Sequence, residues 1–177
     1  RSSATTLSAE GQYAQNPRVV TDINGLSTAV WQHDQGPHDI VQARTSLRGG
    51  PWSPTADVCE GGRNSFSPQV IVDSNGLATV VYQTNEYSAI LGNNISVMKS
   101  RTSFRGGAWS TPVTVSVQGE ESYGQQLSVD SNGLVTAVYE VEDGSNFFIK
   151  STASLRGGAW STPVTLSASG HQTESPQ

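Results

Sequence analysis

Gln69-Val-Ile-Val-Asp-Ser-Asn-Gly-Leu-Ala-Thr-Val-Val-Tyr82 decides the fold, because residues 18–31 and 126–139 repeat it with only some side chains changed. Each copy consists of two short runs of apolar and β-branched residues joined by Asn-Gly. Asn-Gly tolerates the positive φ angles of a type I′ turn and is the strongest short-range hairpin signal that a sequence carries. The stretch therefore predicts a β-hairpin that the chain forms three times.

A second block follows each predicted hairpin. Ser46-Leu-Arg-Gly-Gly-Pro-Trp-Ser53 recurs with small changes at residues 103–110 and 154–161, and the middle repeat carries a short insertion between Tyr82 and Ser103. Self-similarity with a period of about fifty residues indicates a solenoid, a propeller or another repeat architecture. The whole chain is thus expected to be an array of equivalent units.

Each repeat contains four apolar, β-branched segments and no helical period. Four short antiparallel strands in about fifty residues are the dimensions of one β-propeller blade. The predicted strands cover residues 18–21, 69–72 and 126–129 (first), 26–31, 77–82 and 134–139 (second), 39–45, 95–102 and 147–153 (third), and 52–58, 109–115 and 160–166 (fourth), with a weaker fourth copy at residues 3–7.

These strands predict an all-β, propeller-like array of three four-stranded antiparallel blades plus a duplicated edge strand. The expected units are a partial blade (1–17), blade 1 (18–67), blade 2 (68–124), and blade 3 with its following linker (125–177). Three blades do not close a ring, since propellers typically have four to eight. We therefore expect self-association, or further blades in a longer chain.

Composition narrows the class of protein. Of the 177 residues 34% are hydrophobic and 14% charged, and the net charge of −5 argues against a nucleic-acid surface. No stretch is long enough to insert into a membrane, and the make-up rich in Ser, Thr, Gly and Asn favours a secreted or cell-surface protein of bacteria. The lone Cys59 takes the place of a serine in the other repeats and is expected to act as a small packing residue.

The two repeated blocks resemble known repeat families. Val-Asp-x-Asn-Gly-x-x-Thr-x-Val-Trp/Tyr followed by Ser-x-Arg-Gly-Gly-x-Trp-Ser is similar to tandem repeats of about fifty residues in bacterial surface and secreted proteins. It is distantly similar to sialidase-type propellers, whose Asp-box loop has the form Ser-x-Asp-x-Gly-x-Thr-Trp. Here Arg48, Arg105 and Arg156 stand in the aspartate position, and no threonine precedes the tryptophan. The resemblance implies blade architecture far more than sialidase chemistry.

Two kinds of local contact are expected at the recurring turns. Asp22, Asp73 and Asp130 precede the Asn-Gly pairs and are expected to form Asx turns instead of calcium loops. The three recurring arginines are expected to make a local hydrogen bond or to stack on the tryptophan that follows each of them. The second strands end in Trp31, Tyr82 and Tyr139, which are expected to be core or blade-packing residues.

Function is expected on the loops that vary between repeats, which connect the second strand to the third and the fourth to the next first strand. Variable loops on a rigid scaffold are where binding residues concentrate. Their aromatic rings beside amides and carboxylates suit a glycan. The candidate ligand-binding residues are Tyr13, His33, Asp34, Arg63, Phe66, Glu86, Tyr87, Glu121, Tyr123, Asp143, Asn146 and Phe147.

No carboxylate pair, nucleophile with its base, or metal cluster stands out. His33, Asp34, His38 and Asp39 could surround a metal, but loop spacing does not fix them, so we expect no metal, no cofactor and no catalysis. The sequence thus favours a non-catalytic, lectin-like or adhesin-like recognition module. Two alternatives stay open: a structural or assembly repeat that contacts other proteins, and a fragment of a sialidase-like glycosidase propeller.

Overall fold

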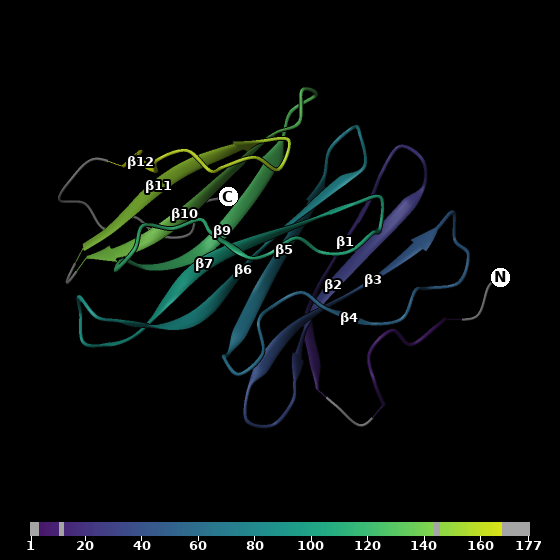
Figure 1. The fold of residues 1–177 in the computed structure, drawn as a ribbon, viewed down its shortest axis with the longest axis horizontal. Coiled ribbons are helices and arrows are strands. Elements are labelled where there is room, and N and C mark those ends of the chain that lie inside the picture. The colour runs from purple at the N-terminus through teal and green to yellow at the C-terminus, as the bar shows by residue number, and fades with distance from the viewer. Residues whose placement is uncertain (1–3, 11–12, 144–145, 168–177) are drawn as a thin grey trace.

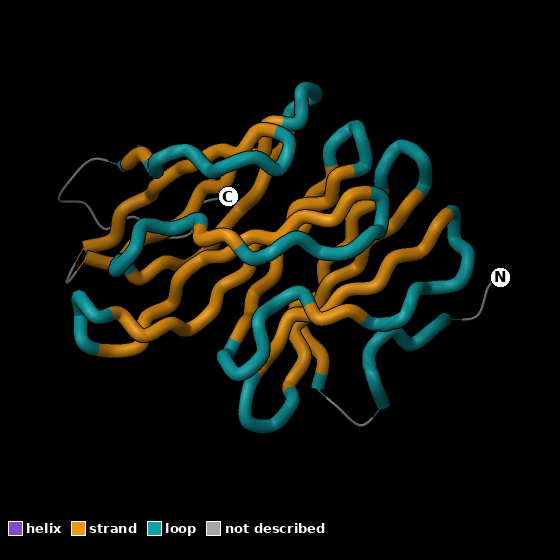
Figure 2. The backbone as a smooth tube through the Cα atoms, viewed as in Figure 1, coloured by secondary structure: helices purple, strands orange, loops and turns teal. Residues whose placement is uncertain are grey.

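The computed structural model describes residues 4–10, 13–143 and 146–167, and in these residues the chain is all-β (Figures 1 and 2). Its strands form three four-stranded antiparallel sheets, and no helix occurs in the described part of the chain. No segment of those residues could therefore cross a membrane as a helix. The predicted array of three four-stranded blades is confirmed.

Each sheet follows chain order, and we call the three sheets blades 1, 2 and 3. Blade 1 contains β1 (Ala14–Thr21), β2 (Leu26–Asp34), β3 (Asp39–Leu47) and β4 (Ala56–Asp57). Blade 2 contains β5 (Ser65–Val72), β6 (Leu77–Ser88), β7 (Asn93–Phe104) and β8 (Val113–Thr114). Blade 3 contains β9 (Glu121–Val129), β10 (Leu134–Asp143), β11 (Asn146–Leu155) and β12 (Val164–Thr165).

The Asn-Gly hairpins form, but their turn differs from the predicted type I′. Gly25 has a φ of 83° while Asn24 is not in the left-handed region, and Gly25 N–H donates to the Asp22 carbonyl over 3.0 Å. The Asp22 carboxylate accepts from Asn24 N–H and Leu26 N–H at 2.9 and 2.8 Å, as the Asx prediction requires. Because the side chain stabilises the turn, only the glycine needs a positive φ.

The arginine of each Arg-Gly-Gly turn binds the neighbouring Asn-Gly turn of its own blade. Arg48 Nε donates to the Asn24 carbonyl over 3.1 Å, and Arg156 Nε does the same to Asn132 over 3.1 Å. Arg105 additionally lies over the Phe104 ring, 4.9 Å from its centroid. The predicted local hydrogen bond is confirmed, and it ties together the two recurring turns of each repeat. The ring that Arg105 contacts is that of the preceding Phe104 and not the predicted following tryptophan.

The strand lengths depart from the sequence prediction at both edges of each blade. The first strands begin several residues before the expected start, and the fourth strands contain only two residues each. Trp52 forms an isolated bridge with Ser46, as the equivalent tryptophans do in the other blades. Residues 4–7, expected to repeat the fourth strand, form no strand, and Ser3 lies outside the described residues.

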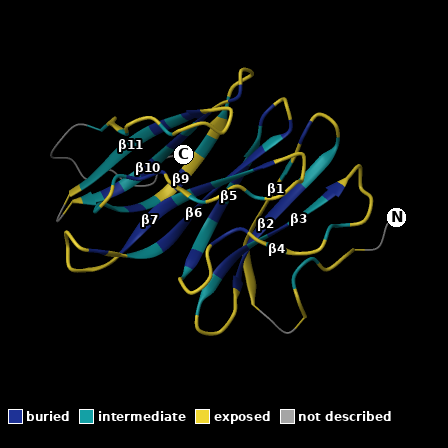
Figure 3. Ribbon diagram, viewed as in Figure 1, coloured by how far each residue is buried: buried dark blue, intermediate teal, exposed yellow. Residues whose placement is uncertain are grey.

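Apolar side chains pack between successive blades, and the buried residues of the strands are dark blue in the ribbon of Figure 3. Tyr82 joins Val30 and Val58 between blades 1 and 2, and Tyr139 joins Val81 between blades 2 and 3. Trp31, Tyr82 and Tyr139 are at most 4% exposed, which confirms their predicted packing role. The members of the two clusters are Val30, Ile40, Val41, Ala43, Val58, Cys59, Val70, Val80 and Tyr82, and then Val81, Met98, Val115, Ala137, Tyr139 and Val141.

Cys59 acts as the small residue that the repeats predicted. Its Sγ accepts from Val41 N–H over 3.2 Å, and Ser116 Oγ accepts from Met98 N–H over 3.1 Å at the equivalent place. Burial raises the pKa of the thiol, which disfavours the nucleophilic thiolate. The Cys59 side chain thus accepts a backbone hydrogen bond of β3 just beyond the end of β4.

Candidate functional site

The first strands of the three blades, β1, β5 and β9, lie beside one another, and each carries a β-bulge. The bulges fall at equivalent positions and place one residue of each strand in the left-handed region: Asn16 (φ 52°), Ser67 (51°) and Gly124 (60°). A bulge bends its strand and redirects the neighbouring side chains. Three strands thus turn side chains toward a common centre.

Amide side chains, three of them buried, fix the bulges to the adjoining strands. Asn16 Nδ2 donates to Gln32 Oε1 over 3.0 Å. Gln83 Nε2 donates to Gln125 Oε1 over 2.9 Å, and Gln125 Nε2 in turn donates to the Ser67 carbonyl. Gln83 and Gln125 are 6% and 2% exposed. A buried network whose members are paired holds its surroundings in one geometry, so the centre is preorganised.

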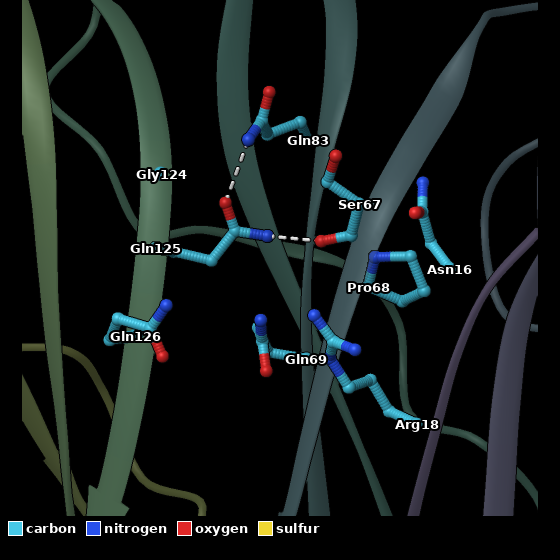
Figure 4. A pocket seen from close by; sticks show the side chains of 9 residues that line it. All are labelled: Asn16, Arg18, Ser67, Pro68, Gln69, Gln83, Gly124, Gln125 and Gln126. Atoms are coloured by element: carbon cyan, nitrogen blue, oxygen red, sulfur yellow. Dashed lines mark hydrogen bonds between the residues drawn. The ribbon is translucent and has the colours of Figure 1, made fainter. Parts of the chain in front are cut away.

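A pocket of about 310 Å³ lies where the bulged strands meet (Figure 4). We call it the axial pocket; its lining residues are Asn16, Arg18, Ser67, Pro68, Gln69, Gln83, Gly124, Gln125 and Gln126. Arg18, Gln69 and Gln126 occupy equivalent positions on the three first strands, because they pair with Val30, Val81 and Val138. Amides donate and accept hydrogen bonds and a guanidinium donates several, so this lining suits a neutral polyhydroxylated ligand.

None of these described lining residues is acidic, but one carboxylate lies next to them. Glu140 occupies the position at which the other blades have Gln32 and Gln83. Its Oε1 is 3.2 Å from the point where a Cβ on Gly124 would lie. Blade 3 therefore brings an acid to the edge of a pocket that is otherwise lined by amides.

The candidates predicted in blade 1 lie away from this pocket. Tyr13 is 82% exposed, and its carbonyl accepts from Asp34 N–H over 3.0 Å. His33 was expected in a loop, but it belongs to β2 and is 2% exposed. Among the described residues, no three His, Cys, Asp or Glu side chains are grouped so that they could hold a metal ion.

The candidates predicted in blade 2 form an ion-paired group. Glu86 Oε1 lies 3.0 Å from Arg63 Nη1 and 2.6 Å from Lys99 Nζ. Burial alone would lower the pKa of Lys99, but its contacts with Glu86 and Glu60 raise it above the ordinary value. Tyr87 is 68% exposed at the end of β6, whereas Phe66 is half-buried in β5. The group has the contacts of a structural ion-pair network.

The candidates predicted in blade 3 gather along β9 and the β10–β11 hairpin. Tyr123 OH donates to Glu142 Oε2 over 3.1 Å, and burial together with Glu121 and Glu142 raises the pKa of the phenol. The remaining three lie at the hairpin: Asp143 pairs with Asn146, and Phe147 pairs with Glu142. The structure thus brings together Arg63 with Glu86 and Tyr123 with its carboxylates, but it does not unite the twelve candidates in one site.

Sequence reasoning missed the axial pocket, although a signal for it exists. Asn16-Pro17 and Ser67-Pro68 recur directly before the predicted first strands. An irregularity repeated at the same place in two blades predicts a bulge, since proline in a strand is confined to edges, starts and bulges. First strands that are predicted to begin at residues 18, 69 and 126 do not include these bulges.

No family model and no curated protein matches this sequence. Solved structures with a similar fold include a thermostable family-43 glycoside hydrolase (TM-score 0.56, 14% identity). An endo-arabinase from Bacteroides thetaiotaomicron (TM-score 0.55, 12% identity) and a GH62 hydrolase in complex with xylotriose (TM-score 0.50, 11% identity) are also similar. The matches cover 91%, 86% and 86% of this chain but only 55%, 61% and 50% of those structures.

These similarities correct two sequence-based predictions. The non-catalytic, lectin-like or adhesin-like interpretation, and with it the expectation that the chain has no part in catalysis, is wrong as the leading hypothesis, because the similar structures are glycoside hydrolases with propeller folds. The second alternative, a fragment of a glycosidase propeller, agrees better with them. The identities of 11–14% establish likeness of fold alone, and the chain spans roughly half of each hydrolase.

Proposed function

We propose that this chain forms part of a propeller-type glycoside hydrolase and that its axial pocket holds a neutral saccharide. The observation that carries the proposal is the convergence of Arg18, Gln69 and Gln126 from three equivalent strands on one pocket. The fold shared with an endo-arabinase and with a hydrolase bound to xylotriose supports a pentose oligosaccharide as the ligand class.

The free polar groups of the pocket match sugar hydroxyls. The Gln69 and Gln126 side chains make no hydrogen bond with other described residues, whereas Gln83 and Gln125 are held by each other. An amide that is free to turn can donate to one hydroxyl and accept from its neighbour. The buried pair keeps the shape of the pocket, and the two free amides with Arg18 contact the ligand.

Glu140 is the candidate carboxylate of the reaction. Hydrolysis of a glycosidic bond uses two carboxyl groups, about 5–5.5 Å apart in retaining enzymes and about 6.5–9.5 Å apart in inverting ones. Glu140 supplies one of them, and the described lining residues of the axial pocket offer no second. The proposal therefore separates binding, which this chain performs, from bond cleavage, which needs a second acid beside Glu140.

Binding is tested by titrating the chain with xylotriose and with a linear arabino-oligosaccharide, followed by side-chain amide NMR and calorimetry. We expect saturable binding, with shifts at the Gln69 and Gln126 amides. Gln69→Ala and Gln126→Ala each remove about one hydrogen bond and should weaken affinity roughly 3- to 10-fold. Gln35→Ala, at an exposed glutamine of the β2–β3 loop, is the matched control and should leave affinity unchanged.

Glu140→Gln restores the residue type that the other blades have at this position, so it should preserve folding and sugar binding. Any release of reducing ends that accompanies binding should disappear in this variant. Binding that is insensitive to both glutamine variants, with shifts confined to the outer loops, would refute the axial site. Absence of saturable binding to either sugar by the folded chain would refute the proposed function.

A further inference from the structure

Successive blades meet through a turn contact that occurs twice in the chain. A Cβ on Gly76 would lie 3.1 Å from Asp22 Oδ2, and a Cβ on Gly133 would lie 3.0 Å from Asp73 Oδ2. The Asx turn of one blade therefore abuts the Asn-Gly turn of the next. Asp22 and Asp73 are only 7% and 5% exposed as a result.

The Arg-Gly-Gly turns make a second contact of the same kind. A Cβ on Gly106 of blade 2 would lie 3.3 Å from Thr45 Oγ1 and 3.5 Å from Leu26 Cδ2 of blade 1. A Cβ on Gly157 of blade 3 would lie 3.0 Å from Leu77 Cδ2 of blade 2. Each blade thus has a leading face, which carries the aspartate and leucine, and a trailing face, which carries the glycines of both turns.

The leading face of blade 3 lacks these contacts in the described part of the chain. Asp130 is exposed and Leu134 is 38% exposed, unlike their buried or half-buried equivalents in blades 1 and 2. Val138 is half-buried, whereas Val30 and Val81 at the same position are 0% exposed. This face keeps the residues of a blade interface without the blade that covers them elsewhere.

The trailing face of blade 1 is the complementary half. The three atoms nearest to a Cβ on Gly25 all belong to Arg48 of its own blade, whereas those nearest to a Cβ on Gly76 include Oδ2 of Asp22 in the preceding blade. A Cβ on Gly49 would meet none of the described residues within 4 Å, where Gly106 meets a threonine and a leucine. The two complementary halves of one interface therefore lie on opposite end blades of the same chain (Figure 1). On the trailing face of blade 1 the turns are uncovered, whereas Ala29 and Trp31 are 7% and 4% exposed.

We propose that the leading face of blade 3 docks on the trailing face of blade 1 of a second copy of this chain. Continuity with the two internal interfaces carries this choice of partner, because blade 1 of a second copy presents both glycine turns in the register that blades 2 and 3 use within the chain. The contact is head-to-tail, so repetition closes a ring if the rotation allows and gives an open chain otherwise.

Residues 6–8 must leave their place on the trailing face of blade 1 when this contact forms. Leu7 and Ser8 border a hollow over Ala29 and Trp31 on the trailing face. Residues 6–8 have the sequence Thr-Leu-Ser, which is also the sequence of residues 165–167 at the edge of blade 3. Both segments suit the same place between two blades, so the contact exchanges one for the other.

The first test is the solution mass of the chain, measured by sedimentation equilibrium from low micromolar to high micromolar concentration. We expect a rise from 18.7 kDa to at least twice that mass. Val138→Asp places a charge on the leading face and should hold the protein at the mass of one chain. Val113→Asp, at a 48% exposed valine of β8, is the matched control and should associate like the parent.

Cysteine cross-linking tests the register and does not depend on whether Val138→Asp folds. Ser74 Oγ donates to the Ser131 carbonyl of the next blade over 3.4 Å, and Ile23 is the equivalent of Ser74 in blade 1. In a Cys59→Ser background, Ile23→Cys with Ser131→Cys should form an interchain disulfide. Ser74→Cys with Ser131→Cys should form one within the chain, which shows that the spacing permits the bond.

Single Ile23→Cys and Ser131→Cys variants should form no interchain disulfide, since a head-to-tail contact does not place a residue next to the same residue of another chain. Linking of Ser131→Cys to itself would indicate a two-fold symmetric contact and would overturn the proposal. So would a mass of one chain at every concentration together with no interchain bond in the double variant. Sugar binding at the axial pocket is measured separately, so failure here leaves the proposed function untouched.

Discussion

Val81→Ala should destabilise the protein far more than the same change at the equivalent Val138. Val81 is 0% exposed and packs with Ala137 and Tyr139 between blades 2 and 3. The substitution removes two buried methyl groups, worth about 0.8 kcal/mol each, and leaves a cavity, so the free energy of unfolding should fall by about 2–3 kcal/mol. Val138 is half-buried, and its loss should cost less than about 1 kcal/mol.

The comparison is made by urea unfolding of dilute protein, followed by tryptophan fluorescence, because Trp160 packs against the same cluster. The unfolding midpoint should move while the slope of the transition stays constant. In a thermal scan the loss for Val81→Ala corresponds to roughly 5–10 °C. Val113→Ala, at an exposed valine, should change stability by less than about 0.5 kcal/mol. Equal losses at Val81 and Val138 would refute the assignment of an interior to the first and an uncovered face to the second.

Three further outcomes follow from single contacts. In urea titrations, Gly76→Ala should lower the unfolding free energy by at least about 1 kcal/mol more than Gly36→Ala. Both positions have a positive φ, but a Cβ on Gly76 would press on Asp22, whereas a Cβ on Gly36 would meet none of the described residues within 4 Å. The pKa of Lys99 is raised above 10.5 in the folded state, so its ion pairs stabilise the protein at neutral pH and this stabilisation is lost as the pH rises past that value. In a pH series of urea midpoints, Lys99→Met should abolish this loss of stability at alkaline pH. Cys59 is buried and its pKa is raised, so a thiol reagent should label it at the rate of opening or unfolding, while Cys59→Ser should change stability by less than about 1 kcal/mol because serine makes the same contact in the other blades.

The proposals about sugar binding and about self-association meet at the axial pocket. Its lining comes from the first strands of all three blades together with Gln83 of β6, so each blade contributes to one site. A second copy docked on blade 3 would place a new first strand beside β9, close to Glu140. Saccharide affinity measured above and below the association range should therefore differ, and equal affinity would show that the three blades alone complete the binding surface.

The sequence by itself determined the repeat, the hairpins and the blade. Asn-Gly, Arg-Gly-Gly and the alternating apolar residues act over a few positions, and the backbone geometry that they require is local. For the same reason the place of Trp31, Tyr82 and Tyr139 at the ends of apolar strands was enough to assign them to the interior. The turn type was predicted wrongly, because the Asp22 carboxylate supplies hydrogen bonds that relieve Asn24 of a positive φ.

Only the tertiary structure decided where the pocket lies and which faces remain uncovered. Arg18, Gln69 and Gln126 are far apart in the chain, and they converge because three blades stack with their first strands together. The bond between Gln83 and Gln125 crosses from one blade to the next, so no local pattern specifies it. The backbone sets the spacing of side chains within a strand, whereas packing decides which separate strands meet. The candidate site of this protein depends on the packing of separate strands.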